Sequence, residues 1–190
     1  MKASAKRVKE ELTSLRKELR SVVKGKYNRV NPFNEDLFDW KEKGRFCGSE
    51  DTTIYDSATI IGDVRIGKSC WIGPFTILDG SGGLTIGHHV DVSSGVKIYT
   101  HDTVKRALTG GRQKAEMAQV SIGNQCFIGT DSVILKGVKI GNSCVVGAKS
   151  LVNSDFPDKS IIAGTPAKKI GRVVVGKEGK ITLVYHRGKR

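Results

Sequence analysis

Aliphatic residues recur every six positions along most of the chain. Every sixth residue from Ile54 to Val96 is aliphatic, and so is every sixth residue from Ile122 to Val152. An amphipathic helix repeats every 3.6 residues and a simple strand every two, so neither requires a strict period of six. A sustained short period of this kind is typical of a repeat architecture.

The period of six predicts a triangular solenoid. Each hexapeptide supplies one short strand and one turn, and three hexapeptides make one coil. The aliphatic side chain points inward and stacks on its equivalent one coil away, because each coil can bury its apolar face only against its neighbours. Glycine often follows the aliphatic residue, and we expect it there because the corners require positive φ angles. The predicted fold class is an all-β solenoid.

The register of six breaks once in this count. Val96 and Ile122 are 26 residues apart, which is four sixes and two residues. We therefore predict an insertion that leaves the solenoid after about residue 102, runs from Thr103 to Met117 and forms a protruding loop over 103–119. A long loop inside a regular solenoid is more often functional than not.

The N-terminal region follows a different pattern. Apolar residues at 8, 12, 15, 19 and 22 form one stripe on a helix expected over residues 4–24. We expect the stripe to dock on the solenoid or on a partner chain. Residues 27–50 hold five aromatic residues and no repeat. This irregular segment either packs over the first coil or lines a binding cleft.

The C-terminal region predicts a hairpin. Residues 172–175 and 181–186 read as two strands around a Gly-Lys-Glu-Gly turn. The expected organisation is a helix and irregular segment over 1–50, the solenoid over 51–170, and a basic hairpin or tail over 171–190.

The positive charge is confined to the two ends. The chain carries a net charge of +13, of which residues 1–26 supply +6 and residues 168–190 supply +7. Basic ends are compatible with nucleic acid, an anionic membrane, a phosphorylated ligand or simple solvation. The neutral body argues against nucleic acid as a partner, and peripheral membrane contact stays open.

Targeting signals are not evident in this sequence. No apolar run approaches the roughly 18 residues of a membrane span, and no apolar signal region follows the N-terminal charges. We therefore expect a cytoplasmic protein with reduced thiols. Cys70, Cys126 and Cys144 fall at a small inward site of the repeat, which predicts packing residues rather than nucleophiles.

The text SIGNQCFIGTDSVILKGVKIGNSCVVGAKSLVNSDFPDKSIIAGTPAKKI carries the repeat in its most regular form. Residues 54–170, which contain this text, resemble the hexapeptide-repeat acyltransferases, the left-handed parallel β-helix family. It is most similar to sugar O-acetyltransferases of the galactoside, maltose and surface-polysaccharide type. The resemblance implies a homotrimer of parallel prisms, with acetyl-CoA as co-substrate in a groove between subunits and no metal.

The resemblance also assigns residues to roles. His101, just before the insertion, fills the place of the general base. An imidazole can take the proton of an attacking hydroxyl and return it to sulfur. A carboxylate should orient that ring, and Asp79, Asp102 and Asp91 are the candidates. Acetyl-CoA contacts are implied for Gly129, Thr130, Gly147, Ala148, Thr165 and Lys168, with the Thr130 N–H as oxyanion donor.

Three alternatives stay open beside acetyl transfer to the hydroxyl of a sugar or nucleotide-linked sugar in surface-polysaccharide synthesis. The first is N-acetylation of a nucleotide-linked amino sugar on the same architecture. The second is a binding or assembly module that uses the basic ends. The third is a zinc site at His88, His89 and His101, which the spacing disfavours because His89 and His101 fall on different edges of the prism.

Overall fold

A computed structural model describes residues 3–37 and 39–186 and divides into two compact units, Met1–Asp39 and Trp40–Arg190. The first unit contains α1 (Ala3–Tyr27) and α2 (Phe33–Leu37). The predicted N-terminal helix is therefore confirmed, with three more residues at its C-terminal end. Within the described residues no helix is both long and apolar enough to span a bilayer.

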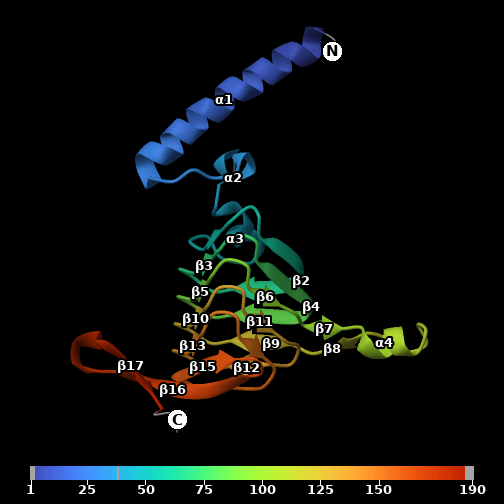
Figure 1. Ribbon diagram of the computed structural model, residues 1–190, viewed down its shortest axis with the longest axis vertical. Helices are drawn as coiled ribbons and strands as arrows, with labels where there is room; N and C mark the ends of the chain where they lie inside the picture. The colour runs from blue at the N-terminus through green and yellow to red at the C-terminus, as the bar shows by residue number, and fades with distance from the viewer. Residues whose placement is uncertain (1–2, 38, 187–190) are drawn as a thin grey trace. The chain divides into compact units, whose positions relative to one another are not determined.

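The second unit is a parallel β-solenoid (Figure 1). Its strands come from three successive sides of each coil and pair with the equivalent strand one coil away, as Ile122 does with Ile140. The strands are β1 (Thr53–Ile54), β2 (Thr59–Ile66), β3 (Trp71–Ile72), β4 (Ile77–Ile86), β5 (Asp91–Val92), β6 (Lys97–Ile98), β7 (His101–Asp102), β8 (Glu116–Met117), β9 (Val120–Ile122), β10 (Phe127–Ile128), β11 (Val133–Ile134), β12 (Lys139–Ile140), β13 (Val145–Val146), β14 (Leu151–Val152), β15 (Ser160–Gly164), β16 (Ala167–Val175) and β17 (Ile181–Tyr185). The short helices are α3 (Glu42–Phe46), α4 (Val104–Leu108) and the 3-10 turn η1 (Lys177–Gly179).

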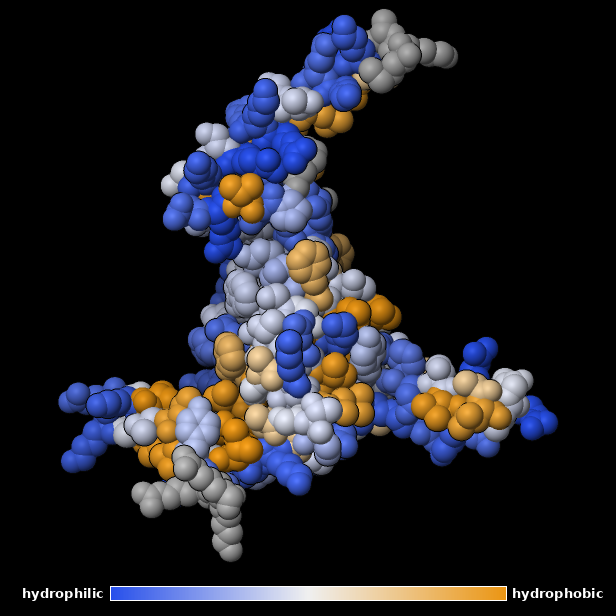
Figure 2. Space-filling view, viewed as in Figure 1, coloured by the Kyte–Doolittle hydropathy of each residue, from blue (hydrophilic) through white to orange (hydrophobic). Residues whose placement is uncertain are grey.

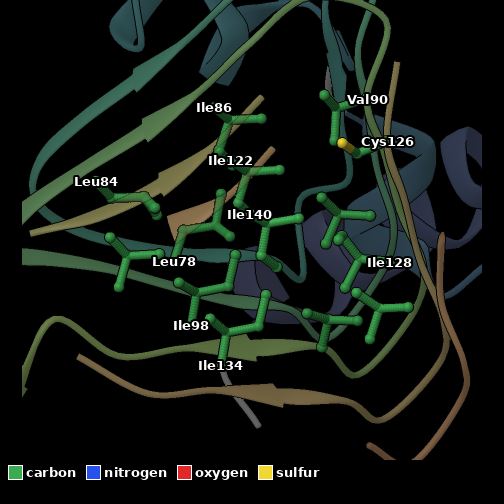
Figure 3. Close-up of a cluster of buried hydrophobic side chains, with 14 of the residues drawn as sticks. Leu78, Leu84, Ile86, Val90, Ile98, Ile122, Cys126, Ile128, Ile134 and Ile140 are labelled. Carbon is green, nitrogen blue, oxygen red and sulfur yellow. The ribbon is translucent and has the colours of Figure 1, made fainter. Parts of the chain in front are cut away.

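Two sheets run along the solenoid. The order in the first is β1-β3-β5-β10-β13-β15-β16-β17, and the second follows β12-β9-β4-β6-β11-β14 with β2 beside β4. The aliphatic residues of these strands point into the prism, where Ile86, Ile122 and Ile140 stack along one side (Figure 3). Ile98 and Ile134 form a second stack and have no exposed surface. The predicted solenoid core is confirmed.

The reason given for the corner glycines was wrong. Gly67, Gly123 and Gly129, which follow the inward aliphatic residue, are not in the positive-φ region. A Cβ at Gly129 would lie 2.5 Å from the backbone nitrogen of Ala148 in the next coil. Glycine is needed there because adjacent coils approach too closely for any side chain. The positive φ angles fall two residues further on and are adopted by ordinary residues such as Gln125.

The position of the register break was also wrong. Leu78 pairs with Ile60, eighteen residues earlier, but Ile86 pairs with Ile66, twenty residues earlier. Two extra residues therefore enter the solenoid as a bulge in β4, between Leu78 and Leu84. From there on, the strand positions are two residues later than the count in sixes gave, and Ile98 rather than Val96 occupies the third strand position.

The predicted insertion is present as an arm. β7 and β8 pair antiparallel, with His101 opposite Met117, and α4 lies between them. The chain leaves the solenoid after β6 and returns at β9. Figure 1 shows the arm projecting sideways from the stack of coils.

Ion pairs fix the base of this arm to the neighbouring coil. Lys136 Nζ lies 3.0 Å from Asp102 Oδ2 and 2.7 Å from Glu116 Oε2, and Lys105 also contacts Glu116. The hydrogen bond from Lys105 and then that from Lys136 lower the pKa of Glu116, and Lys136 lowers the pKa of Asp102. These ion pairs contribute their full stabilisation of the arm above about pH 4.5. That stabilisation is lost as the pH falls through the lowered pKa values of the two carboxylates.

The segment before the first coil packs over the end of the solenoid core. Trp40 stacks on Tyr55 with ring centroids 5.3 Å apart, and Tyr55 meets Trp71 edge to face. Cys47, after α3, is buried and its carbonyl accepts the N–H of Ile66. Residues 40–47 therefore cover the first coil, which is one of the two roles predicted for residues 27–50. Phe38 lies outside the described residues.

The predicted C-terminal hairpin is confirmed by β16 and β17, which pair antiparallel from Gly171 with Tyr185 to Val175 with Ile181. Figure 2 shows apolar side chains gathered over this hairpin and over the arm. The residues concerned are exposed, including Ile181 and Leu183 on the hairpin and Leu108 on the arm. The cysteines at 70, 126 and 144 are buried as predicted, and burial raises the pKa of the Cys70 thiol.

The stacked core predicts a large cost for truncating one inward residue. Ile140→Ala should lower the free energy of unfolding by about 2–5 kcal/mol, because it leaves a cavity between two coils. Lys139→Ala is the matched control, since Lys139 is on the same strand and exposed. Urea denaturation followed by circular dichroism measures both, and equal losses would contradict the inward stack.

The ion pairs of the arm predict that Lys136 restrains it. Lys136→Met should speed tryptic cleavage at Lys105 and Arg106 several-fold while leaving the melting temperature nearly unchanged, because no core residue is removed. Lys139→Met removes the same charge from the next strand and is the control. If both variants are cleaved at the wild-type rate, the arm is held by something else.

Candidate active site

The centre of the candidate site is a pair formed by His101 and Asp79. His101 Nδ1 lies 2.5 Å from Asp79 Oδ2. His101 is the first residue of the arm, on β7. Asp79 directly follows the buried Leu78 in β4, in the preceding coil. The carboxylate is 1% exposed and the imidazole 35% exposed. A buried carboxylate thus supports a ring whose other edge faces outward.

Asp79 is held in its charged form despite its burial. Loss of solvent is the largest influence and opposes the charge, but the Ser81 hydroxyl and amide and then His101 outweigh it and lower the pKa of Asp79. The Ser81 hydroxyl donates to Asp79 Oδ1 at 2.6 Å, and the Ser81 N–H donates to the same oxygen at 2.9 Å. One carboxylate oxygen is therefore occupied by Ser81 and the other is directed at His101.

The two-residue bulge creates this arrangement. The bulge lies at Gly80–Gly83 in β4, where β2 has a shorter stretch opposite. The Thr100 hydroxyl bridges the bulge to the next coil, donating to the Asp79 carbonyl at 2.8 Å and accepting the Gly82 N–H at 2.7 Å. A side chain at Gly82 would meet the Thr100 carbonyl oxygen at 2.5 Å. The bulge therefore needs glycine for close approach.

Sequence reasoning missed Ser81 and Thr100. The sequence Asp79-Gly80-Ser81 carries the signal for the first, because an Asp side chain often accepts the N–H two residues on in a turn. Thr100 carried no comparable signal, because its partners belong to the preceding coil.

The geometry sets the proton positions of His101. An ionised carboxylate only accepts hydrogen bonds, so Nδ1 donates its hydrogen to Asp79. In the neutral ring Nε2 then carries a lone pair, and it has no hydrogen-bond partner among the described residues. The ring can therefore accept a proton at Nε2 from a bound molecule while Asp79 stabilises the resulting imidazolium.

The other two candidate carboxylates lie elsewhere. Asp102 faces Lys136 and accepts the N–H of Val104 at 3.0 Å, so it holds the arm rather than the ring. Asp91 is exposed on β5, which belongs to the other sheet than the β6 strand that leads to His101. Of the three carboxylates, the structure brings only Asp79 to His101.

The adjacent histidines belong to a corner of the solenoid. His88 Nδ1 accepts the N–H of Lys68 at 2.8 Å, and His89 adopts a positive φ of 55°. Neither lies with His101. Within residues 3–37 and 39–186, no three His, Cys, Asp or Glu side chains gather as metal ligands would.

The residues expected to contact acetyl-CoA line one corner. The Thr130 carbonyl accepts the N–H of Lys149 at 2.8 Å, and the Lys149 carbonyl accepts the Thr165 hydroxyl at 3.3 Å. Gly129 and Gly147 begin this corner in successive coils, where each follows its strand. In the described part of the chain, the N–H groups of Thr130 and Ala148 donate to no other residue. Thr130 and Ala148 are both exposed residues.

The two groups of residues occupy different corners of one prism. Thr130 and Ala148 follow strands β10 and β13 of the first sheet, whereas His101 follows β6 of the second. Lys168, on β16 opposite Ala163, is exposed near the corner that holds Thr130 and Ala148, which we call the Thr130 corner. One chain therefore keeps His101 and the Thr130 corner a full side of the prism apart.

Residues 119–154 match the family described as "Bacterial transferase hexapeptide (six repeats)". Over an alignment of 95 residues that covers 46% of this chain, the sequence is 50% identical to Protein CapG of Staphylococcus aureus. It corresponds to 51% of CapG, so the chain spans about half the length of this curated relative.

Solved structures share the fold. A hexapeptide-repeat containing acetyltransferase from Vibrio cholerae is 26% identical, covers 85% of this chain and 92% of its own, and superposes with a TM-score of 0.61. A maltose O-acetyltransferase from Clostridium difficile is 22% identical, with coverage of 86% and 88% and a TM-score of 0.63. AntD, an N-acyltransferase from Bacillus cereus in complex with dTDP and 3-hydroxybutyryl-CoA, is 20% identical, with coverage of 71% and 88% and a TM-score of 0.58.

The Vibrio cholerae acetyltransferase has also been solved with acetyl coenzyme A. These relatives and neighbours are the class that the repeat pattern resembles, so the predicted resemblance is confirmed. The fold is a left-handed parallel β-helix of hexapeptide repeats, as in the hexapeptide-repeat acetyltransferases.

Proposed function

We propose that this chain transfers an acetyl group from acetyl-CoA to a hydroxyl of a sugar or nucleotide-linked sugar, with His101 as general base. The observation that carries the proposal is the pairing of a buried, ionised Asp79 with the outward-facing His101 at the base of the arm. The hydroxyl and the N–H of Ser81 hold the carboxylate, so Asp79 has support besides the histidine ring.

His101 would move one proton in each direction. Nε2 accepts the proton of the acceptor hydroxyl as its oxygen attacks the acetyl carbonyl carbon. Asp79 stabilises the imidazolium through Nδ1, and Nε2 then gives the proton to the sulfur as the carbon–sulfur bond breaks. The Thr130 N–H is oriented by the coil and would stabilise the negative charge on the carbonyl oxygen.

The Thr130 corner has the chemistry to hold acetyl-CoA, which supplies the activated acetyl group. The donors at Thr130 and Ala148 suit the amide carbonyls of a pantetheine arm, and Thr165 adds a hydroxyl at the same corner. Lys149 and Lys168 are exposed there and suit the phosphates of the nucleotide end.

His101 and the Thr130 corner can serve one reaction only between copies of the chain. One prism holds them on different corners. If a second copy places its Thr130 corner beside His101 of the first, the groove between them receives acetyl-CoA. This requirement supports the homotrimer that the resemblance implied.

The arm is the part of the chain that we propose covers the acceptor. It starts at His101 itself and carries exposed basic residues, including Arg106 and Arg112. Its two acids, Asp102 and Glu116, are already paired with lysines. A nucleotide-sugar phosphate would suit this charge. The match to Protein CapG supports surface-polysaccharide synthesis as the context, and acetyl-CoA as donor supports a cytoplasmic reaction.

N-acetylation of an amino sugar is the second candidate. Its support is the shared fold with AntD, an N-acyltransferase crystallised with dTDP. A neutral amine attacks without losing a proton beforehand, so this reaction would depend less on His101.

The proposed mechanism predicts a selective defect for His101→Asn. The variant should lose roughly 10²–10⁴-fold in kcat on a sugar hydroxyl, the usual effect of removing a general base. Its CoA affinity should be unchanged, because that corner is built from coil backbone. His89→Asn, at an exposed corner, is the control.

Thiol release from acetyl-CoA measures both variants with hydroxyl and amino acceptors. Near wild-type turnover of His101→Asn on the hydroxyl acceptor would remove His101 as the base. N-acetylation would be favoured if His101→Asn loses activity only on the hydroxyl acceptor and the wild type turns over the amine faster than the hydroxyl.

A further inference from the structure

Helix α1 carries an uninterrupted heptad pattern. Two sets of positions, a and d in the heptad notation, are apolar throughout residues 5–22: Ala5, Val8, Leu12, Leu15, Leu19 and Val22. The outward positions b, c and f are all polar or charged from residue 6 to residue 24. Three heptads with this separation are typical of a coiled coil.

The apolar face of α1 is exposed in the single chain. Val8, Leu12, Leu15 and Val22 keep between 40% and 59% of their surface accessible. An apolar stripe of this length costs free energy in water unless another surface covers it. The flanking charges identify what that surface is.

The positions beside the stripe carry opposite charges. In the first two heptads, Lys9 and Arg16 occupy the e positions, and Glu11 and Glu18 occupy the g positions, whereas Val23 and Gly25 hold the third e and g positions. In a parallel coiled coil a g residue faces the e residue of the next heptad on the neighbouring helix, which places Glu11 against Arg16. An antiparallel pair would instead bring e to e and g to g, so that like charges meet. The charge pattern therefore fits a second copy of the same helix in parallel orientation.

The core positions indicate the number of strands. Two of the three d positions hold β-branched valine, and two of the three a positions hold leucine. Leucine at a with a β-branched residue at d favours three or four strands over two.

The contacts that these charges already make are compatible with that pairing. Arg7 pairs with Glu11 one turn away at 2.9 Å, and both side chains are largely exposed. Exposed ion pairs of this kind contribute little, and a carboxylate accepts from several donors. Arg16 has an interaction of its own within the chain, and its guanidinium has five N–H donors.

We propose that α1 joins copies of this chain through a parallel coiled coil of three or four α1 helices, with Glu11 and Arg16 as the pair that sets its orientation. The coil holds the N-terminal segments together independently of the contacts between solenoids. Its test does not depend on the proposed chemistry.

Cysteine cross-linking in the full chain tests the orientation. Val8→Cys lies at one end of the stripe, Val22→Cys at the other, and Ser14→Cys on the outward face is the matched control. The four native thiols are buried, and the wild-type chain measures their background. After mild oxidation, Val8→Cys alone should link chains several-fold more than Ser14→Cys. Equal linking of the two variants would overturn the proposal. So would linking that appears only when Val8→Cys and Val22→Cys chains are mixed, because that result indicates an antiparallel pair.

Charge exchange tests the assigned pair. In the Val8→Cys background, Glu11→Lys should lower cross-linking several-fold at low salt, and Glu11→Lys with Arg16→Glu should restore it. No loss in the first variant, or no recovery in the second, would overturn the role of this pair. Sedimentation equilibrium of the wild type should give the mass of three or four chains, and the mass of two would contradict the strand number.

Discussion

The close approach of successive coils is the constraint on which the rest of this structure depends. Parallel strands stack at a spacing of about 4.8 Å, so the aliphatic side chain of each strand points inward, and several of the corners that follow it require glycine. Gly129 illustrates the limit, because a Cβ there would lie 2.5 Å from the next coil. A repeat this tight leaves little room for polar groups within the prism, and the buried carboxylate of Asp79 lies where the repeat is interrupted.

Two interruptions meet at His101. The two-residue bulge at Gly80–Gly83 turns Asp79 and Ser81 toward each other, and the arm begins one coil later with His101 above them. The bulge supplies a buried carboxylate, and the arm supplies a ring with one free edge. Neither interruption alone brings Asp79 and His101 together. The copies that would complete the site with a Thr130 corner are the same copies that the heptads of α1 would hold in parallel.

The solenoid was predictable because the aliphatic position recurs in many hexapeptides, so that one misassigned position does not change the predicted fold. The helix, the arm and the terminal hairpin were predictable for a similar reason, since each has its own period or turn residues. His101 was found through the resemblance, but its partner was not decided among Asp79, Asp102 and Asp91. That choice depends on contacts between coils. The two extra residues of the β4 bulge were also not visible in the count in sixes, because Leu84 and Val96 are aliphatic and buried as well. The count therefore placed the register break after Val96 instead of before Leu84.

The turnover of Asp79→Asn compared with that of Asp102→Asn tests the central claim most directly. Both substitutions keep the shape of the side chain and remove one negative charge near His101. The pairing observed here predicts that Asp79→Asn loses about 10²-fold or more in kcat, because the ring loses its tautomer and the charge that stabilises the imidazolium. Asp102→Asn should stay within a few-fold in kcat, since Asp102 faces Lys136. Equal turnover of the two variants, or a larger loss for Asp102→Asn, would contradict the account.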